Sequence, residues 1–328
     1  MKLPLDLKTK SNQRKLKLLA ITIILILSSI LFLMAGPQAL NLVESQANSE
    51  NLQEAVKLEG TVLAQSTPVI QESKVEVVSS NLPVPQLSAL AIAAMDTRTG
   101  KILYEKNINK QMAPASTTKI MTAIIASEHF SSADLLTVPQ EAIVGGSTMG
   151  LKPGEQLSFR SLLYGLMLNS GNDAAFTIAI NYPGGYDKFI SKMNEKASEL
   201  GLKDTHFNNP AGFDSPTHYS SAHDLLQIGK AAMVNAKLGK VFSTKETSVT
   251  SIDKSHIHVL KNLNKLLNED GVIGIKTGTT EMAGESLVGL VEKNGQTLLI
   301  VVLNSDDRFG EMKSLIDWIF QNYSWKVS

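Results

Sequence analysis

The sequence of 328 residues contains no cysteine. This absence excludes disulfides, thiolate metal sites and a cysteine nucleophile, although it is compatible with either redox compartment. A charge excess is also missing, because 31 basic residues balance 31 acidic residues and the formal net charge is zero. No polyanionic partner is implied, so we do not expect nucleic acid as a ligand. Hydrophobic residues make up 43% of the chain, which is ample for a core in one large domain or two small ones.

A metal motif is also missing. The six histidines include no HExxH spacing. His256 and His258 alternate as they would on a strand and point the same way, but no third ligand accompanies them. We therefore expect neither a metal nor another cofactor.

The N-terminus combines a basic segment with an uncharged apolar run. Six lysines and arginines lie in residues 1–17, and the run from Leu18 to Ala35 is 18 residues without charge. Such a run is long enough to span a bilayer with little tilt. The basic flank should stay in the cytoplasm, so we expect residues 18–36 to anchor a body outside the cell membrane. The alternative is a cleaved signal peptide and secretion, but Pro37 interrupts the best cleavage site.

The composition changes again after the apolar run. Residues 37–85 are dominated by Gln, Asn, Ser, Glu and Pro and contain no aromatic residue. Such a segment cannot bury enough apolar surface to fold alone, so we expect a disordered linker that gives reach from the membrane. Within it, only Val69 to Val78 shows some alternation typical of a strand. The folded domain is predicted to cover residues 86–326.

The pattern of elements in this domain predicts an α+β fold. Leu87 to Asp96 and Lys101 to Lys106, joined by a turn, indicate a β-hairpin. Ser116 should open a helix after Pro114. Further helices are expected at 162–168, 174–181, 186–200, 222–234 and 312–323, and strands at 271–276, 286–292 and 298–304. Strands at both ends with helices between them predict an antiparallel sheet built from the two chain ends, flanked by a helical lobe.

Three short motifs follow one another in this domain: Ser116-Thr117-Thr118-Lys119, Ser170-Gly171-Asn172 and Lys276-Thr277-Gly278. On a helix, the first motif places a hydroxyl and an amine on one face, about 5–6 Å apart at Cβ. A serine needs an adjacent base to act as a nucleophile. A desolvated lysine near another cation can be that base, because burial and like charge both lower its pKa. Lys276 could be that cation.

The three motifs form the arrangement of the active-site serine, penicillin-recognising enzymes. The stretch Ala113 to Ala123 resembles the nucleophile segment of the low-molecular-mass penicillin-binding proteins, more narrowly the S11-type D-alanyl-D-alanine carboxypeptidases. The segments around the other two motifs, together with 149–155 and 307–309, are also similar. The likeness runs from about Leu87 to about Tyr323. It implies the fold of serine β-lactamases and transpeptidases, in which an antiparallel sheet lies beside a helical lobe.

The resemblance also implies roles for single residues. Ser116 would be the nucleophile, Lys119 its base, and Ser170 the group that carries the proton to the leaving amine. Asn172 would bind the substrate amide, and the backbone of Thr279 would complete the oxyanion hole with that of Ser116. Lys276, Thr277 and Gly278 would line the cleft on an edge strand, where Gly278 lets the substrate backbone come close. Arg308 would bind the terminal carboxylate, or else form a surface ion pair with Asp306 or Asp307.

The implied activity is removal of the terminal D-alanine from peptidoglycan stem peptides, with β-lactam antibiotics as covalent inhibitors. A D,D-endopeptidase that cuts cross-links would use the same motifs. A β-lactamase would need an extra glutamate for deacylation, and the acids between Ser170 and Lys276 lie in no Glu-x-x-x-Asn frame. A non-catalytic binding module is disfavoured because every catalytic residue type is present. The best-known members have a second β domain and a C-terminal anchor, so we expect the N-terminal helix to supply the anchor here.

Overall fold

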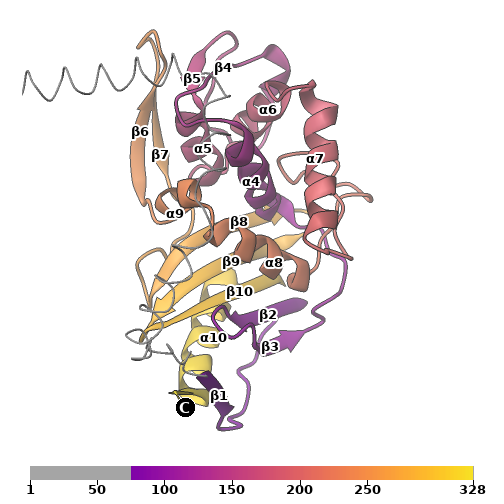
Figure 1. The fold of residues 1–328 in the computed structure, drawn as a ribbon, viewed down its shortest axis with the longest axis vertical. Coiled ribbons are helices and arrows are strands. Elements are labelled where there is room, and N and C mark those ends of the chain that lie inside the picture. Colours follow the sequence, from indigo (N-terminus) through magenta and orange to yellow (C-terminus); the bar gives the residue numbers. More distant parts are fainter. Residues whose placement is uncertain (1–74, 328) are drawn as a thin grey trace, which may run out of the picture. The chain divides into compact units, whose positions relative to one another are not determined.

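The computed structural model describes residues 75–327. The predicted cytoplasmic segment, the anchor and most of the linker lie outside these residues. At the centre of the described part is a five-stranded sheet in the order β3-β2-β10-β9-β8, with every neighbouring pair antiparallel (Figure 1). The strands are β2 (Ala91–Asp96), β3 (Ile102–Lys106), β8 (Val272–Thr280), β9 (Gly284–Lys293) and β10 (Gln296–Ser305). The α+β fold and the β2–β3 hairpin predicted from the sequence are confirmed.

Each face of the sheet is covered by a helix from a different part of the chain. Alternate residues of β10 divide between the two cores, with Leu299 and Val301 on one face and Ile300 and Val302 on the other. The first face packs with α8 (Ala222–Met233) and the helical lobe, and the second with α10 (Arg308–Asn322). The central strands are therefore apolar on both faces, as expected for strands that are buried on both sides.

The helical lobe lies between the two halves of the sheet in sequence, and Figure 1 shows β8 as the strand nearest to it. Its helical elements are η1 (Ala115–Thr118), α4 (Lys119–His129), η2 (Gln140–Ala142), α5 (Phe159–Met167), α6 (Asn172–Ile180), α7 (Gly185–Glu199) and α9 (Ala236–Phe242). Two small antiparallel ribbons complete it: β4 (Leu135–Thr137) with β5 (Gln156–Ser158), and β6 (Glu246–Thr250) with β7 (Ile257–Lys261). The sequence did not predict these ribbons or α9.

Capping residues set two helix starts earlier than the apolar pattern does. Ser158 accepts a hydrogen bond from the Ser161 amide, so α5 begins at Phe159 and not at 162. Asp307 caps α10 through the Gly310 amide, so this helix begins at Arg308 and not at 312. An N-cap satisfies backbone N–H groups that have no partner inside the helix. The earlier start of α10 matters for the site, because it makes Arg308 the first residue of the helix.

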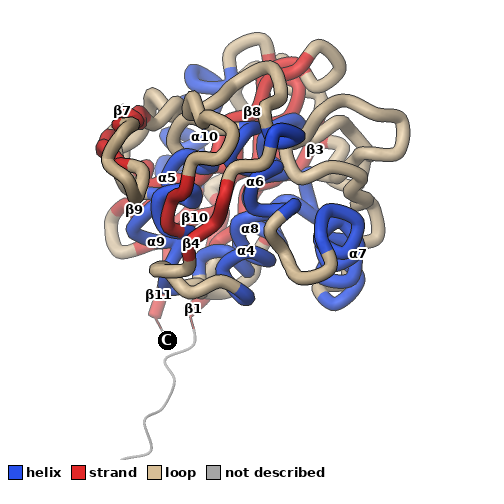
Figure 2. The backbone as a smooth tube through the Cα atoms, turned by 90° about the horizontal axis from the view of Figure 1, so that it is seen from above, coloured by secondary structure: helices blue, strands red, loops and turns tan. Residues whose placement is uncertain are grey.

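The linker prediction is wrong for its last residues. β1 (Val75–Ser79) pairs antiparallel with β11 (Tyr323–Val327), and Figure 2 shows the two strands side by side. The chain then continues along α10, where the Leu82 amide donates to Asn322 Oδ1. The folded part therefore begins by Val75, and not at 86, because β11 offers this segment a partner strand. Within residues 75–327, no helix has the length and hydrophobicity needed to cross a membrane.

Candidate active site

Ser116 lies in a 3₁₀ turn that leads directly into α4. The sequence predicted that Ser116 opens the helix, whereas the structure shows η1 over residues 115–118 and the α-helix from Lys119 onward. Thr117 fixes the turn by donating its hydroxyl to the Pro114 carbonyl at 2.6 Å. Ala115, just before the serine, has a φ of +47°, in the left-handed region that non-glycine residues rarely adopt. The turn thus holds Ser116 in a constrained backbone position.

Two glycines from distant segments press against this turn. A Cβ on Gly212, whose φ is +89°, would lie 1.8 Å from the Ala115 carbonyl oxygen. A Cβ on Gly278 would lie 3.1 Å from the Ser116 amide nitrogen and 3.0 Å from the Ala115 Cβ. The resemblance implies that Gly278 lets a substrate backbone come close. The close neighbour in the structure is the protein's own backbone, which carries the candidate nucleophile.

Lys119 is completely buried, and its amine has three oxygen partners. Its Nζ lies 2.9 Å from Ser116 Oγ, 2.7 Å from Asn172 Oδ1 and 2.6 Å from the Ala211 carbonyl oxygen. The amide and carbonyl oxygens can only accept hydrogen bonds. A neutral amine therefore gives its two N–H groups to Asn172 and Ala211, and its lone pair faces the Ser116 hydroxyl. This geometry lets Lys119 accept the serine proton.

The surroundings of Lys119 favour that neutral form. Burial lowers the pKa of Lys119 well below its usual range, and the nearby charge of Lys276 lowers it further, while Asp173 acts in the opposite direction. Desolvation penalises the charged form because the protein interior solvates an ammonium less well than water.

Lys276 is the second buried amine of the site. It lies on β8, is 2% exposed, and donates to the Thr277 carbonyl at 3.0 Å. Burial and the charge of Arg308 lower its pKa to about 7. A lysine with such a pKa exchanges a proton readily near neutral pH.

The Ser-Gly-Asn motif forms the turn between α5 and α6. Ser170 has a φ of +58° and is buried, and Asn172 is the first residue of α6. Asn172 donates its side-chain amide to the Gly145 carbonyl at 2.8 Å, while its oxygen accepts from Lys119. Within residues 75–327, no hydrogen bond joins Ser170 Oγ to either site lysine. The structure therefore connects the second motif to Lys119 through Asn172 and leaves Ser170 without such a bond.

β8 is the last strand of the sheet, and its Lys-Thr-Gly-Thr run lies beside η1. Arg308 reaches this strand from the start of α10. Its guanidinium donates to the Gly278 carbonyl at 2.7 Å and to the Thr279 hydroxyl. Its acidic neighbour is Glu285, with Nε 3.9 Å from Oε2. The ion pair with Asp306 or Asp307 that the sequence left open is not formed in the described structure, where Asp307 caps α10 instead.

The loop that contains Ala211 and contacts Lys119 was not among the features predicted from the sequence. Asn209 Oδ1 accepts from the backbone amides of Ala211, Gly212 and Phe213, which fixes the Ala211 carbonyl that bonds Lys119. His218 joins this loop to the nucleophile segment, because its Nε2 lies 2.8 Å from Thr118 Oγ1 and its Nδ1 accepts from the Asn208 amide at 3.1 Å. Burial is the main cause that lowers the pKa of His218 to about 4. The Asn208-Asn209-Pro210 run was the available signal, since asparagines favour such turns.

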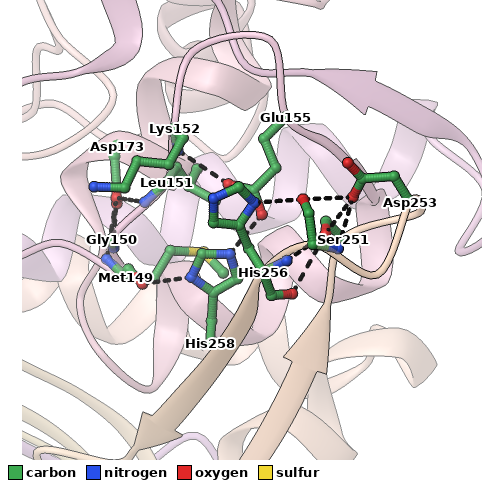
Figure 3. Close-up of polar contacts among 11 residues, drawn as sticks. Met149, Gly150, Leu151, Lys152, Glu155, Asp173, Ser251, Asp253, His256 and His258 are labelled. Atoms are coloured by element: carbon green, nitrogen blue, oxygen red, sulfur yellow. Dashed lines mark hydrogen bonds and ion pairs between the residues drawn. The ribbon is translucent and has the colours of Figure 1, made fainter.

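The two histidines considered as metal ligands have other partners. His258 is buried and lies 2.6 Å from Glu155, and His256 stacks on it with ring centroids 6.5 Å apart (Figure 3). Among residues 75–327, no group of three acidic, histidine or cysteine residues could hold a metal ion.

Comparison with known proteins agrees with this architecture. The model of the S11 peptidase family, described as D-alanyl-D-alanine carboxypeptidase, matches residues 77–307. The D-alanyl-D-alanine carboxypeptidase DacF of Bacillus subtilis is 35% identical over 246 residues, which are 72% of this chain and 63% of the relative. DacB2 of Mycobacterium tuberculosis is 33% identical over 74% of this chain and 86% of its own length. The crystal structure of the Streptomyces K15 DD-transpeptidase matches with a TM-score of 0.70 and 32% identity, over 73% of this chain and all of that one.

The chain therefore belongs to the S11 family of serine peptidases. It spans slightly less than two thirds of the length of DacF and of DacD from Escherichia coli.

Proposed function

We propose that this protein is a serine-type D-alanyl-D-alanine carboxypeptidase that removes the terminal D-alanine from peptidoglycan stem peptides. The observation that carries the proposal is the contact between Lys119 and Ser116, with the other two partners of the amine both being acceptors. This arrangement directs the lone pair of a neutral amine at the serine hydroxyl. Membership of the S11 family supports the substrate class.

In the first step, Ser116 Oγ attacks the carbonyl of the penultimate D-alanine while Lys119 accepts its proton. The backbone N–H groups of Ser116 and Thr279 stabilise the oxyanion, as preorganised donors do in acyl transfer. The intermediate collapses when the proton reaches the nitrogen of the leaving D-alanine. We assign this transfer to Ser170 and Lys276, which requires Ser170 Oγ to come within hydrogen-bond reach of Lys119 when the substrate binds. The pKa of Lys276, about 7, suits the transfer.

In the second step, water attacks the ester carbon of the acyl-enzyme. The proton that this water loses returns to Ser116 Oγ through Lys119, which restores the free enzyme. This two-step route is nucleophilic catalysis that needs no metal.

The cleft recognises the end of the stem through polar groups around β8. Asn172 hydrogen-bonds the amide of the substrate, while Lys276, Thr277 and Arg308 surround its terminal carboxylate. A guanidinium suits a carboxylate because it presents parallel donors. Gly278 contributes by keeping β8 close to the nucleophile turn.

Residues 18–36 anchor the protein in the cell membrane in this proposal, and the catalytic domain faces the outside. The support is the uncharged run after a basic flank. Protease added to spheroplasts should then degrade the catalytic domain, whereas an intact domain would contradict the topology. A mature protein that starts near Leu40 and washes off the membrane would identify the run as a signal peptide.

The activity itself is tested with a β-lactam and two defined substrates. Intact-mass spectrometry after exposure to penicillin should show one adduct on the Ser116 peptide, and none in Ser116→Ala. Release of D-alanine from a pentapeptide stem, without cleavage of a cross-linked dimer, would identify a carboxypeptidase. Cleavage of the dimer would indicate a D,D-endopeptidase. Rapid turnover of penicillin would indicate a β-lactamase, and the absence of an adduct would indicate a non-catalytic binding module.

A further inference from the structure

The segment from Gly145 to Glu155 has no role in the proposed chemistry, but it directly holds Asn172. The backbone amide of Asn172 donates to the Ser147 carbonyl at 2.7 Å, and its side-chain amide donates to the Gly145 carbonyl at 2.8 Å. The remaining polar atom of this side chain, Oδ1, bonds Lys119. The position of this segment therefore determines how Asn172 approaches the base.

Asp173 ties the same segment to the start of α6. Its buried carboxylate accepts from the backbone amides of Met149, Gly150 and Leu151, each at 3.0 Å. Several N–H donors around one carboxylate satisfy the charge in a site that water cannot reach.

His258, from the β6–β7 hairpin, holds the segment from the opposite side (Figure 3). Its Nδ1 donates to the Met149 carbonyl at 3.0 Å, and its Nε2 lies 2.6 Å from Glu155 Oε1. The other carboxylate oxygen of Glu155 accepts from the Lys152 amide at 3.0 Å, so Glu155 also closes the turn in which it lies. The side chains of His258 and Glu155 are only 5% and 1% exposed, so water does not compete for these bonds.

The peptide group between Met149 and Gly150 is hydrogen-bonded both to His258 and to Asp173. The carbonyl of Met149 and the N–H of Gly150 belong to the same planar trans peptide and point in opposite directions. His258 bonds the carbonyl, and Asp173 bonds the N–H. Gly150 has a φ of +85°, a conformation that favours glycine at this point.

The side chain of Met149 adds a third attachment. It packs so tightly on α5 that a Cβ on Gly165 would lie 2.0 Å from the Met149 sulfur. The carbonyl of Gly165 in turn accepts from the Gly171 amide at 3.0 Å, one residue before Asn172. A movement of Met149 would therefore be transmitted to the Ser-Gly-Asn turn through the bond of its amide to Asp173 and through the packing of its side chain on Gly165.

We propose that His258 and Glu155 are positioning residues that set Asn172 against Lys119 through the Met149–Gly150 peptide. They contact neither the substrate nor the nucleophile. They act by fixing the segment 145–155, to which Asn172 is hydrogen-bonded. This inference rests on the proposed function, since its effect appears in acylation of Ser116. What the pair must supply is hydrogen-bond geometry and not charge.

Two substitutions of Glu155 separate geometry from charge. Glu155→Gln removes the charge but keeps the shape: its NH₂ donates to Nε2 of a neutral His258 and its oxygen accepts from the Lys152 amide. Glu155→Asp keeps the charge but shortens the side chain by one methylene, so it cannot make both bonds. Glu246→Asp is the matched control, because it shortens an exposed glutamate on β6 of the same hairpin.

The readouts are the acylation rate constant for penicillin on the full chain and hydrogen–deuterium exchange of the peptide covering residues 145–155. We expect Glu155→Asp to acylate roughly tenfold to a hundredfold more slowly, since a misplacement of about 1 Å can cost as much as a hundredfold. Exchange in 145–155 should rise in the same variant. Glu155→Gln and Glu246→Asp should stay close to the wild type in both measurements.

Two results would overturn the inference: an unchanged rate in Glu155→Asp, with or without faster exchange, or a loss in Glu155→Gln as large as that in Glu155→Asp. Each assumes that the wild type is acylated on Ser116. A wild type without an adduct, or a Ser116→Ala variant with the same adduct, would reject the proposed function instead. Exchange across the remaining peptides shows whether each variant is folded during the measurement.

Discussion

The amine of Lys119 lies 2.6 Å from the carbonyl oxygen of Ala211, a residue 92 positions further along the chain. This contact and the one to Asn172 occupy both N–H groups of a neutral lysine, which leaves its lone pair for Ser116. The proposed role of Lys119 as general base therefore depends on two segments outside its own helix, the start of α6 and the loop that contains Ala211. Proton transfer from Ser116 needs such alignment, because a base must be within hydrogen-bond reach of the proton that it removes.

Lys276→Gln should shift the acid limb of the acylation rate to higher pH. The charge of Lys276 helps to lower the pKa of Lys119, so its removal lets that pKa rise. Lys119 accepts a proton only when it is neutral. As the pH is lowered, the acylation rate of the variant should therefore begin to fall at a higher pH than that of the wild type. The pH profile of penicillin acylation measures the shift, with Lys230→Gln on the exposed side of α8 as control. An unchanged limb with a lower plateau would show that Lys119 is not the titrating base.

Gly278→Ala should slow acylation and destabilise the domain by about 1–3 kcal/mol, the usual cost of overpacking. The new methyl group would lie 3.1 Å from the Ser116 amide, so β8 or the nucleophile turn must move. Denaturant unfolding and penicillin labelling check both effects. Gly239→Ala is the control, because nothing lies near its Cβ within α9, and this change should stabilise by roughly 0.5–1 kcal/mol. Full acylation by Gly278→Ala would disprove the close-contact role.

The buried His218, which contacts Thr118 beside the proposed nucleophile, should make the protein sensitive to acid. His218 has a pKa of about 4 in the folded protein against an ordinary value of 6.5, so the unfolded state binds more protons between these values. Stability from this residue is complete above about pH 6.5 and is lost as the pH falls toward about 4.

His218→Gln should therefore reduce the dependence of unfolding free energy on pH. At about 1.4 kcal/mol per pH unit, the histidine accounts for roughly 2 kcal/mol of the loss between pH 7.5 and 5. Denaturant titrations of the wild type and the variant at both values measure this difference. The same pH dependence in both proteins would assign acid sensitivity to other groups.

Arg308→Ala should reduce kcat/KM for a stem peptide with a free C-terminal carboxylate. A hydrogen bond to a charged group contributes about 1.5–3 kcal/mol, so we expect a loss of at least tenfold. Against a C-terminally amidated analogue the loss should be much smaller, because the partner charge is gone. Arg98→Ala, in the exposed turn between β2 and β3, is the control. Equal losses on both substrates would mean that Arg308 acts through its bonds to Gly278 and Thr279.

The sequence predicted much of what depends on neighbours within a few positions, although the local caps at Ser158 and Asp307 were not among its predictions. The Ser-x-x-Lys spacing fixes the relation between Ser116 and Lys119 because one helical turn brings them together. The β2–β3 hairpin and most of the helices followed from apolar periodicity, which reports the buried face of each element. The motifs and their order were also sufficient to recognise the family that the comparisons show.

Only the tertiary structure decided which distant groups complete the site. The Ala211 carbonyl on Lys119, the tight approach of Gly278 to Ser116 and the partner of β1 are contacts between remote segments. No local pattern encodes such contacts, since each depends on how whole elements pack. The sequence alone determined that a serine and a lysine lie on one turn. The packing of the sheet against the lobe determined that both acceptors face the lysine and that it is buried close to Lys276. Burial and the charge of Lys276 are the physical reasons for its lowered pKa.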